Sequence, residues 1–386
     1  MEKISRRRFI EDSLALLGVA TLPGGLLAES TPRYRLRAGA NDRIRIACIG
    51  VNGRGMAHVR AYANMDDVLV TYICDPDTAT FAKAVQAVEE TGKPAPKTVQ
   101  DIRRVLDDKS VDAISIATPN HWHALAAIWA MQAGKDVYVE KPSTHNIFEG
   151  QRMVEAAKKY GRVCQVGTQS RSSSGINSAM SYLHSGQLGK VYLSRGLCYK
   201  PRGSIGKVSG PQPPPSTVDY DLWLGPAPKK PVRRARFHYD WHWQWDYGNG
   251  DLGNQGVHEM DKARWGLNKH TLPNSVLALG GRFGYEDDGE TPNTIITFMD
   301  YGDSQLIFEV RGLSTDELKP VKGGIGAKIG NIFYCEKGIL VMPNYSSATA
   351  YDNDGNKVEE FKGGGDHFRN FIDTMRTRNM IRLNCD

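Results

Sequence analysis

Residues 46–55 read Ile46-Ala47-Cys48-Ile49-Gly50-Val51-Asn52-Gly53-Arg54-Gly55, an apolar run that passes into a glycine-rich turn. The run predicts a buried strand, and Met56 to Asn64 predict the helix that follows. Glycines at such a junction permit a tight turn and the close approach of a pyrophosphate to the helix N-terminus. The spacing matches G-x-G-x-x-G at Gly50 and Gly55, whereas Asn52 replaces the middle glycine. Asparagine tolerates left-handed conformations, so we expect the turn to form and Gly50, Asn52, Gly53, Arg54 and Gly55 to bind a dinucleotide.

An acidic residue follows the second predicted strand, Val68 to Cys74. Asp75 lies about 20 residues beyond the glycines, where an acid hydrogen-bonds the ribose hydroxyls of a dinucleotide. A carboxylate there would repel a 2′-phosphate, so Asp75 favours NAD over NADP. The alternative is that Asp75 is a plain turn or helix-capping residue.

Strands and helices alternate from residue 43 to residue 167, which predicts a parallel, doubly wound Rossmann sheet. Beyond it, residues 168–386 contain consecutive strand-like runs with few helices between them. That pattern predicts a second α+β domain with an open, mostly antiparallel sheet. One helix is expected over Leu252 to Leu267 and another over His367 to Arg378.

Two polar segments follow predicted strands of the first domain, Ala117-Thr118-Pro119-Asn120-His121-Trp122-His123 and Glu140-Lys141-Pro142. Open α/β sheets bind ligands at the carboxyl ends of their strands. A lysine at such a strand tip is placed to direct its ammonium at a substrate beside the nicotinamide. The alternative is a surface lysine before a loop proline.

Together these segments resemble the glucose–fructose oxidoreductase, inositol dehydrogenase and rhizopine catabolism superfamily, Gfo/Idh/MocA. The resemblance extends in order through the chain, over the Gly50 turn, Asp75, Thr118-Pro119-Asn120, Glu140-Lys141-Pro142, Val166-Gly167-Thr168-Gln169 and Gly248 to Asp261. It implies a catalytic Lys141, with Glu140 and Pro142 shaping the nicotinamide site. It also implies that Asn120, His123 and Gln169 line the cofactor, that Thr118 and Pro119 belong to the same site, and that the open sheet packs in dimers or tetramers.

The family's second signature, a glycine cluster and then Asp-x-Gly-x-His-x-x-Asp, is matched here by Gly248 to Asp261. Asn254, His258 and Asp261 share one helix face by their spacing, and a polar face on a buried helix needs partners such as substrate hydroxyls. His258 is suited to accept a hydroxyl proton near neutral pH, although it is also suited to be a structural histidine. Asn254 stands where the family has an aspartate, and an amide cannot act as an acid or base.

An aromatic stretch, Phe237-His238-Tyr239-Asp240-Trp241-His242-Trp243-Gln244-Trp245, precedes that signature. Its alternating tryptophans predict either one packed strand face or a surface on which sugar rings stack. We therefore expect Trp241, Trp243 and Tyr199 to border the substrate.

The chain begins with Ser5-Arg6-Arg7-Arg8-Phe9-Ile10 and a short apolar stretch to Leu27. Paired arginines before a glycine-containing apolar segment predict a twin-arginine export signal over residues 1–28, then a linker over 29–42 and a periplasmic location. The alternative is a basic amphipathic arm. The apolar part is too short for a membrane span.

The rest of the 386-residue chain has an ordinary globular composition, with 24% charged residues and a net charge of +6. Basic residues are scattered apart from Arg233, Arg234 and Arg236, so nucleic-acid binding is not expected. None of the six cysteines forms a Cys-x-x-Cys pair, so no metal site is expected.

These features predict an NAD-dependent oxidoreductase that acts on a hydroxyl of a sugar, glycoside or polyol. An exported enzyme cannot rely on soluble NAD, so we expect a tightly bound cofactor that is recycled, with Lys141 or His258 as the base. The resemblance includes NAD-dependent glycosidases, in which oxidation, elimination, hydration and reduction cleave a glycoside. The alternatives are a simple sugar dehydrogenase and an inactive, NAD-loaded sugar-binding protein. The C-terminus is expected to be shortened relative to similar proteins.

Overall fold

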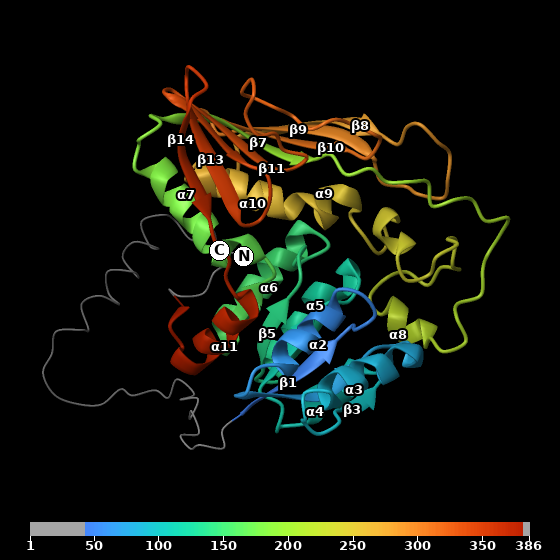
Figure 1. Ribbon diagram of the computed structural model, residues 1–386. Coiled ribbons are helices and arrows are strands. Elements are labelled where there is room, and N and C mark those ends of the chain that lie inside the picture. Colours follow the sequence, from blue (N-terminus) through green and yellow to red (C-terminus); the bar gives the residue numbers. More distant parts are fainter. Residues whose placement is uncertain (1–42, 381–386) are drawn as a thin grey trace, which may run out of the picture. The chain divides into compact units, whose positions relative to one another are not determined.

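The computed structural model describes residues 43–380, and the predicted leader and linker lie outside these residues. Two sheets are present (Figure 1). The predicted fold, a parallel Rossmann sheet followed by a mostly antiparallel sheet, is confirmed.

The first sheet has six parallel strands in the order β3-β2-β1-β4-β5-β6. Buried aliphatic side chains on both of its faces pack against helices, as expected for strands that read as continuous apolar runs. The strands are β1 (Ile44–Ile49), β2 (Val68–Cys74), β3 (Lys97–Val99), β4 (Ala113–Ile116), β5 (Asp136–Val139) and β6 (Cys164–Val166). The helices that connect them are α2 (Gly55–Ala63), α3 (Phe81–Glu89), α4 (Ile102–Asp107), α5 (Asn120–Gln132) and α6 (Ile147–Tyr160).

The second sheet has eight strands in the order β14-β13-β12-β11-β7-β10-β9-β8. All neighbours are antiparallel except β7 and β10. Its strands are β7 (Val191–Cys198), β8 (Ser275–Gly281), β9 (Thr294–Asp300), β10 (Gln305–Arg311), β11 (Ile329–Cys335), β12 (Gly338–Met342), β13 (Ser347–Asp352) and β14 (Lys357–Lys362). Helices α7 (Ser174–His184) and α10 (Gly256–Gly266) pack on the same side of it (Figure 1).

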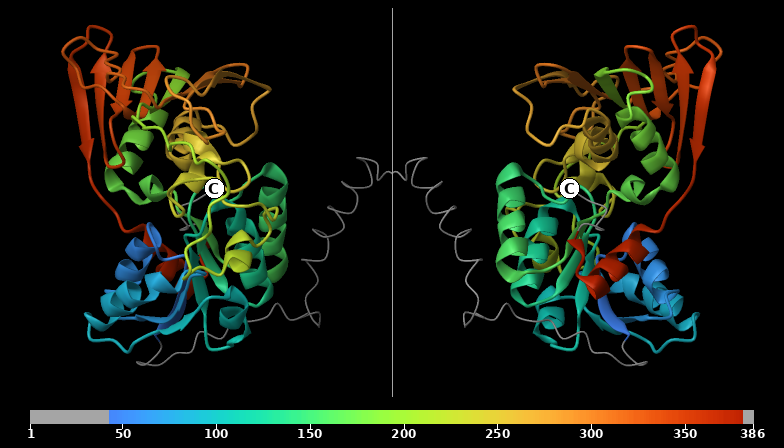
Figure 2. Two further views of the ribbon diagram at one scale, coloured as in Figure 1. Left: turned by 90° about the vertical axis from the view of Figure 1, so that its right-hand side faces the viewer. Right: turned by 90° about the vertical axis from the view of Figure 1, so that its left-hand side faces the viewer.

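The last helix, α11 (His367–Thr377), follows the second sheet in the chain but packs on the first. Phe371, Ile372 and Met375 are buried in the same core as β1 and α2. Arg369 donates two hydrogen bonds to Asp67, which strengthens this attachment. Figure 2 shows α11 in red beside the blue segments of the first domain in both views. The segment 168–386, which was assigned to the second domain from its sequence, therefore contributes its last helix to the first.

Two local expectations differ from the structure. The helix expected over Leu252 to Leu267 is divided into α9 (Gly250–Asn254) and α10, with Gln255 between them. The tryptophan stretch is not a strand, because residues Asp240–Trp243 form a 3-10 turn. Among residues 43–380, no helix is long and apolar enough to cross a membrane.

Candidate functional site

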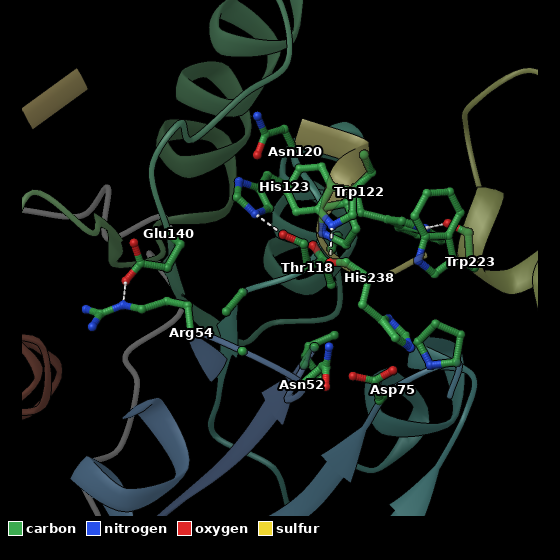
Figure 3. A pocket seen from close by; sticks show the side chains of 18 of the residues that line it. Asn52, Arg54, Asp75, Thr118, Asn120, Trp122, His123, Glu140, Trp223 and His238 are labelled. Atoms are coloured by element: carbon green, nitrogen blue, oxygen red, sulfur yellow. Dashed lines mark hydrogen bonds and ion pairs between the residues drawn. The ribbon is translucent and has the colours of Figure 1, made fainter. Parts of the chain in front are cut away.

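A cavity of about 330 Å³ opens at the carboxyl ends of the first sheet's strands. One side is formed by the turn after β1, by Asp75 after β2, by Thr118 after β4 and by Lys141 after β5. The opposite side comes from residues 222–242 and from Asn254 on α9. Figure 3 shows several of these side chains converging on the cavity. Most residues predicted to bind the cofactor are thus brought together by the topology of the sheet.

The glycine turn is tightly packed at two positions and open at a third. Gly50 has φ +78°, and a Cβ on Gly55 would lie 1.8 Å from the Gly50 carbonyl oxygen. A side chain at either position would therefore distort the turn. A Cβ on Gly53 would meet no atom within 4 Å. Gly53 thus leaves open space in the cavity wall at the N-terminus of α2, where no acidic side chain occupies the first turn.

Asp75 is fixed by the backbone around it. Its carboxylate accepts hydrogen bonds of 2.8 Å from the Val51 amide and 3.0 Å from the Asp77 amide. Burial raises the pKa of Asp75, against which these two hydrogen bonds act. Figure 3 shows Asp75 and Asn52 on neighbouring strand ends at the cavity edge.

These residues fit a dinucleotide. The Thr118 hydroxyl oxygen is buried beside the cavity and has no hydrogen-bond partner among residues 43–380. A buried hydroxyl of this kind calls for a ligand atom. Together with the open space at Gly53 and the carboxylate of Asp75, it provides contacts for the phosphates and ribose hydroxyls of NAD.

Glu140 is the centre of a buried polar network. Its carboxylate accepts hydrogen bonds from Arg54 at 2.8 Å, from Gln169 at 2.9 Å and from His58 at 3.1 Å. Burial opposes ionisation, but the hydrogen bond and charge of His58 and the charge of Arg54 hold the pKa of Glu140 well below its usual range. Glu140 therefore stays ionised and positions its neighbours. Gln169 reaches the site only through this network, since it does not line the cavity.

Lys141 lines the cavity beside Asn254. Its ammonium donates hydrogen bonds to the backbone carbonyl of Asn254 and, at 3.2 Å, to the side-chain oxygen of the same residue. Burial lowers the pKa of Lys141. The amide that replaces the family's aspartate is thus the direct partner of the predicted catalytic lysine.

Asn120 and His123 hold neighbouring loops together at the start of α5. The Asn120 amide donates to the Asn249 side-chain oxygen at 2.9 Å. The two ring nitrogens of His123 contact the carbonyls of Pro142 and Thr118 at 2.6 and 2.8 Å. Both residues line the cavity, as does Pro119.

His258 and Asp261 lie outside the cavity lining. His258 is buried against the Tyr345 ring, and its Nδ1 has no partner in the described part of the chain. Burial and the charge of Lys141 lower the pKa of His258 to about 3. Asp261 accepts two hydrogen bonds from Arg171, at 2.6 and 2.9 Å.

The predicted aromatic contacts divide between cavity and core. Trp241 lines the cavity. Trp243 is buried under the Arg202 guanidinium, 5.4 Å from its ring centre, and does not line it. Tyr199 donates its hydroxyl to Glu309 at 2.9 Å and also lies outside the lining.

The roof of the cavity, which we define as residues 212–245, was predicted only in part: Trp241 was expected at the site, whereas Leu222, Trp223 and His238 were not. The Asp219 amide donates to the Pro76 carbonyl at 2.9 Å, and the Trp122 indole donates to the Trp223 carbonyl at 3.0 Å. His238 hydrogen-bonds Asp77 at 2.7 Å. The sequence feature that indicates this roof is its density of tryptophan, histidine and tyrosine. Such side chains are costly to leave in water on a long irregular segment, so they are expected to pack against another part of the protein.

Comparison with known proteins identifies the family. A model of an oxidoreductase family with an NAD-binding Rossmann fold matches residues 44–168, and the model of that family's C-terminal alpha/beta domain matches residues 190–385. A glycosyl hydrolase family 109 protein from Shewanella pealeana is 30% identical over 179 residues, which are 42% of this chain and 39% of that protein. One from Stenotrophomonas maltophilia is 36% identical over 146 residues, 36% of this chain and 30% of that protein. The chain thus matches two fifths or less of the length of these relatives.

Solved structures share the fold at low sequence identity. Levoglucosan dehydrogenase in complex with NADH and levoglucosan has a TM-score of 0.62 at 20% identity, covering 83% of this chain and 80% of that one. The WlbA dehydrogenase from Bordetella pertussis, in complex with NADH and UDP-GlcNAcA, has a TM-score of 0.60 at 20% identity, covering 89% and 90%.

Proposed function

Because this chain belongs to the Gfo/Idh/MocA family of NAD-binding oxidoreductases, we propose that it oxidises a hydroxyl of a sugar, glycoside or polyol. One observation carries the proposal: a single cavity joins the dinucleotide residues Gly53 and Asp75 to Lys141, under an aromatic roof. Aromatic rings beside polar groups suit the stacking and hydrogen bonding of a pyranose. The sugar ligands of the dehydrogenases with the same fold, and the glycosyl hydrolase name of the partial relatives, support the choice of substrate class.

The residues of the cavity have distinct proposed roles. When bound, NAD supplies a hydride acceptor for the carbon that carries the hydroxyl. The Lys141 ammonium already donates to two oxygens of Asn254, so a substrate oxygen is a natural third acceptor. A positive charge at that oxygen stabilises the negative charge that develops when its proton leaves. Glu140 keeps Arg54 and Gln169 in place without exchanging protons itself.

We further propose that the cofactor is retained and recycled, with net cleavage of a glycoside. Oxidation of the C3 hydroxyl gives a ketone that acidifies the C2–H bond. Loss of that proton expels the C1 substituent and leaves an enone. Water then adds at C1, a proton returns to C2, and the ketone is reduced, so the sum is hydrolysis. Retention of the cofactor is supported by the roof, which contacts the first domain at Pro76 and at Trp122. Both residues line the cavity, so these contacts hold the roof over the proposed NAD site.

Isotope labelling tests the cycle. A glycoside with deuterium at C3 should keep that label in the product, while deuterium from the solvent enters at C2. Accumulation of free ketose with one equivalent of NADH for each substrate would instead establish simple dehydrogenation.

Retention of the cofactor has a separate test. Native mass spectrometry should detect NAD(H) on the purified protein. His238→Ala removes the hydrogen bond to Asp77 and should speed NAD release by about tenfold, the effect of about 1.4 kcal/mol. His270→Ala, at an exposed position with a hydrogen bond to Asn268, is the matched control. Equal rates of NAD release in the two variants would show that the roof does not retain the cofactor through His238.

Asn254 favours one other candidate, a sugar-binding protein that holds NAD without turnover. An amide at this position gives Lys141 a hydrogen-bond acceptor but no proton exchange. If the NAD-loaded protein binds pyranosides and neither reduces its cofactor nor releases product, this candidate replaces the enzyme.

Export through the twin-arginine route is proposed from residues 1–28, which lie outside the described residues. Cell fractionation should recover the protein in the periplasm. Joint replacement of Arg6 and Arg7 by lysine should retain it in the cytoplasm. A variant that is exported as well as the original chain would exclude this route.

A further inference from the structure

One histidine in the cavity has no assigned role. His242 belongs to the 3-10 turn Asp240–Trp243 and lines the same cavity as Lys141 and Asn254. His258, the histidine that the family signature designates, does not line it. The histidine at the cavity is therefore His242, for which the sequence predicted no role, whereas His258 is buried outside the cavity.

The hydrogen bonding of His242 fixes its tautomer. Its Nδ1 lies 2.6 Å from the Tyr239 carbonyl oxygen, which only accepts hydrogen bonds, so Nδ1 carries the proton. In the neutral ring, Nε2 then presents a free lone pair. No partner for Nε2 occurs among residues 43–380, and this nitrogen is not enclosed by protein atoms. It is thus available to a ligand in the cavity.

Packing holds the ring in one orientation. The Trp241 ring stacks on it, with centroids 3.7 Å apart and planes 19° apart. The ring of Tyr239, the residue before this turn, lies 4.9 Å away. A Cβ on Gly248 would lie 2.6 to 2.7 Å from the His242 Cα and carbonyl oxygen. Only glycine therefore permits the backbone at position 248 to pack this closely against the turn. A fixed imidazole with one bare nitrogen is a preorganised proton acceptor.

We propose that His242 accepts the proton of the substrate hydroxyl through Nε2, while the Lys141 ammonium hydrogen-bonds to the same oxygen. This inference rests on the proposed oxidation of a sugar hydroxyl. In that step the O–H bond breaks and its proton goes to His242. The C–H bond breaks and its electron pair and hydrogen leave as hydride to NAD, and the carbon and oxygen become a ketone. In the reverse step the same nitrogen returns the proton to the alkoxide.

The electrostatic surroundings keep the ring available. Burial lowers the pKa of His242 to about 4, and the positive charges of Lys141 and Arg202 act in the same direction. Asp251 opposes them from α9, but its carboxylate is held by two hydrogen bonds from Arg202. His242 is therefore neutral at neutral pH, as a proton acceptor must be.

The test compares three histidine-to-asparagine variants of the NAD-loaded protein. In His242→Asn the amide can still donate to the Tyr239 carbonyl, but no base remains. It should lower kcat by about 100-fold or more, the usual contribution of a general base, and change the affinity for the sugar by less than about threefold. His258→Asn should lower kcat less than His242→Asn does. His270→Asn is the control at an exposed position outside the cavity.

Two further measurements separate a catalytic role from a structural one. Nitrogen NMR of the imidazole should show His242 protonated on Nδ1 and bare on Nε2, and a sugar should shift the Nε2 signal without shifting that of His258. His242→Gln, whose amide extends toward the Nε2 position, should bind sugar as the asparagine variant does and remain slow.

The outcomes are distinguishable. If the original protein turns over no glycoside or polyol, the proposed function fails. If it turns over and His242→Asn keeps a third or more of kcat, or loses sugar affinity in proportion to kcat, the function stands and the role of His242 is refuted. If thermal unfolding shows that His242→Asn does not fold, the same criteria are applied to kcat and sugar affinity of His242→Gln, together with the NMR signals of the original protein.

Discussion

Asn254 stands where the family signature has an aspartate, and its carbonyl and amide oxygens are the acceptors for the Lys141 ammonium. Asn254→Asp would place a negative charge at hydrogen-bond distance from that ammonium. An opposite charge favours the protonated form, so the variant should raise the pKa of Lys141, which burial lowers in the present chain, by about one unit or more. If the ammonium is the active form, activity is lost as pH rises through this pKa, and the alkaline limb of the pH–rate profile should move to higher pH. A profile that does not move, or moves to lower pH, would contradict this role of the ammonium.

Gly53 and Gly55 are separated only by Arg54, yet they should respond differently to substitution by alanine. A Cβ on Gly53 meets nothing within 4 Å, whereas one on Gly55 collides with the Gly50 carbonyl. Gly53→Ala should therefore fold normally and fill space that the pyrophosphate needs, lowering NAD affinity by about tenfold or more, or about 1.4 kcal/mol. The assay is calorimetric titration of the cofactor-free protein together with its thermal unfolding. Gly364→Ala, which also meets no atom and lies between β14 and α11, should change neither. Unaltered NAD affinity in the Gly53 variant would place the pyrophosphate elsewhere.

Residues that act through local geometry were predictable, and those that act through distant packing were not. The positions of Gly50, Asp75 and Lys141 follow from strand ends, because parallel strands bring their carboxyl ends to one edge. The choice between His242 and His258 depends on how a long irregular segment folds back over that edge. No periodicity in the sequence encodes the path of that segment. The family signature therefore pointed to His258, and no sequence pattern pointed to His242.

At the scale of elements, helix α11 connects the end of the chain to the first domain. Phe371 is fully buried in the core that contains β1 and α2. Phe371→Ala should reduce the free energy of unfolding by about 3–5 kcal/mol, the usual effect of truncating a buried phenylalanine. Chemical denaturation measures the change. Thr377→Ala, on the exposed side of the same helix, should remain within about 0.5 kcal/mol of the original protein. Equal effects of the two substitutions would mean that α11 does not pack in this core.

Local sequence features explain which helices and strands could be predicted. Helix α11 was predicted to within one residue because its apolar residues recur at helical spacing on one face. The helix expected over Leu252 to Leu267 is interrupted because Gly253 and Gly256 weaken it, and Gly256 lies against the Phe308 ring, where a Cβ would be 2.4 Å away. Strands β13 and β14 are rich in alanine, serine, lysine and glutamate, and the low β-propensity of these residues leaves little sign of a strand in the sequence.

At the scale of the whole molecule, the second sheet has helices on one side only within residues 43–380. Leu306, Phe308 and Val310 of β10 face α10 and are buried. On the opposite face, Leu277 and Leu279 of β8 are 57% and 65% exposed, and Phe298 of β9, the register partner of Leu277, is 41% exposed. Strands that are apolar on both faces normally have both faces covered. A contiguous apolar area of this kind on a sheet marks an interaction surface.

We therefore predict that the protein is a homo-oligomer, a dimer or tetramer, that buries this face against another copy. Joint replacement of Leu277 and Leu279 by glutamate should dissociate it, because each interface would then contain uncompensated buried carboxylates. Sedimentation velocity at micromolar concentration measures the mass. Ile147 lies on α6 of the first domain and is 81% exposed, so Ile147→Glu should leave the oligomer intact. The cavity is formed within one chain, so the dissociated variant should still bind NAD, which separates loss of assembly from loss of fold. A monomeric original protein, or a glutamate variant of unchanged mass, would show that this face has another purpose.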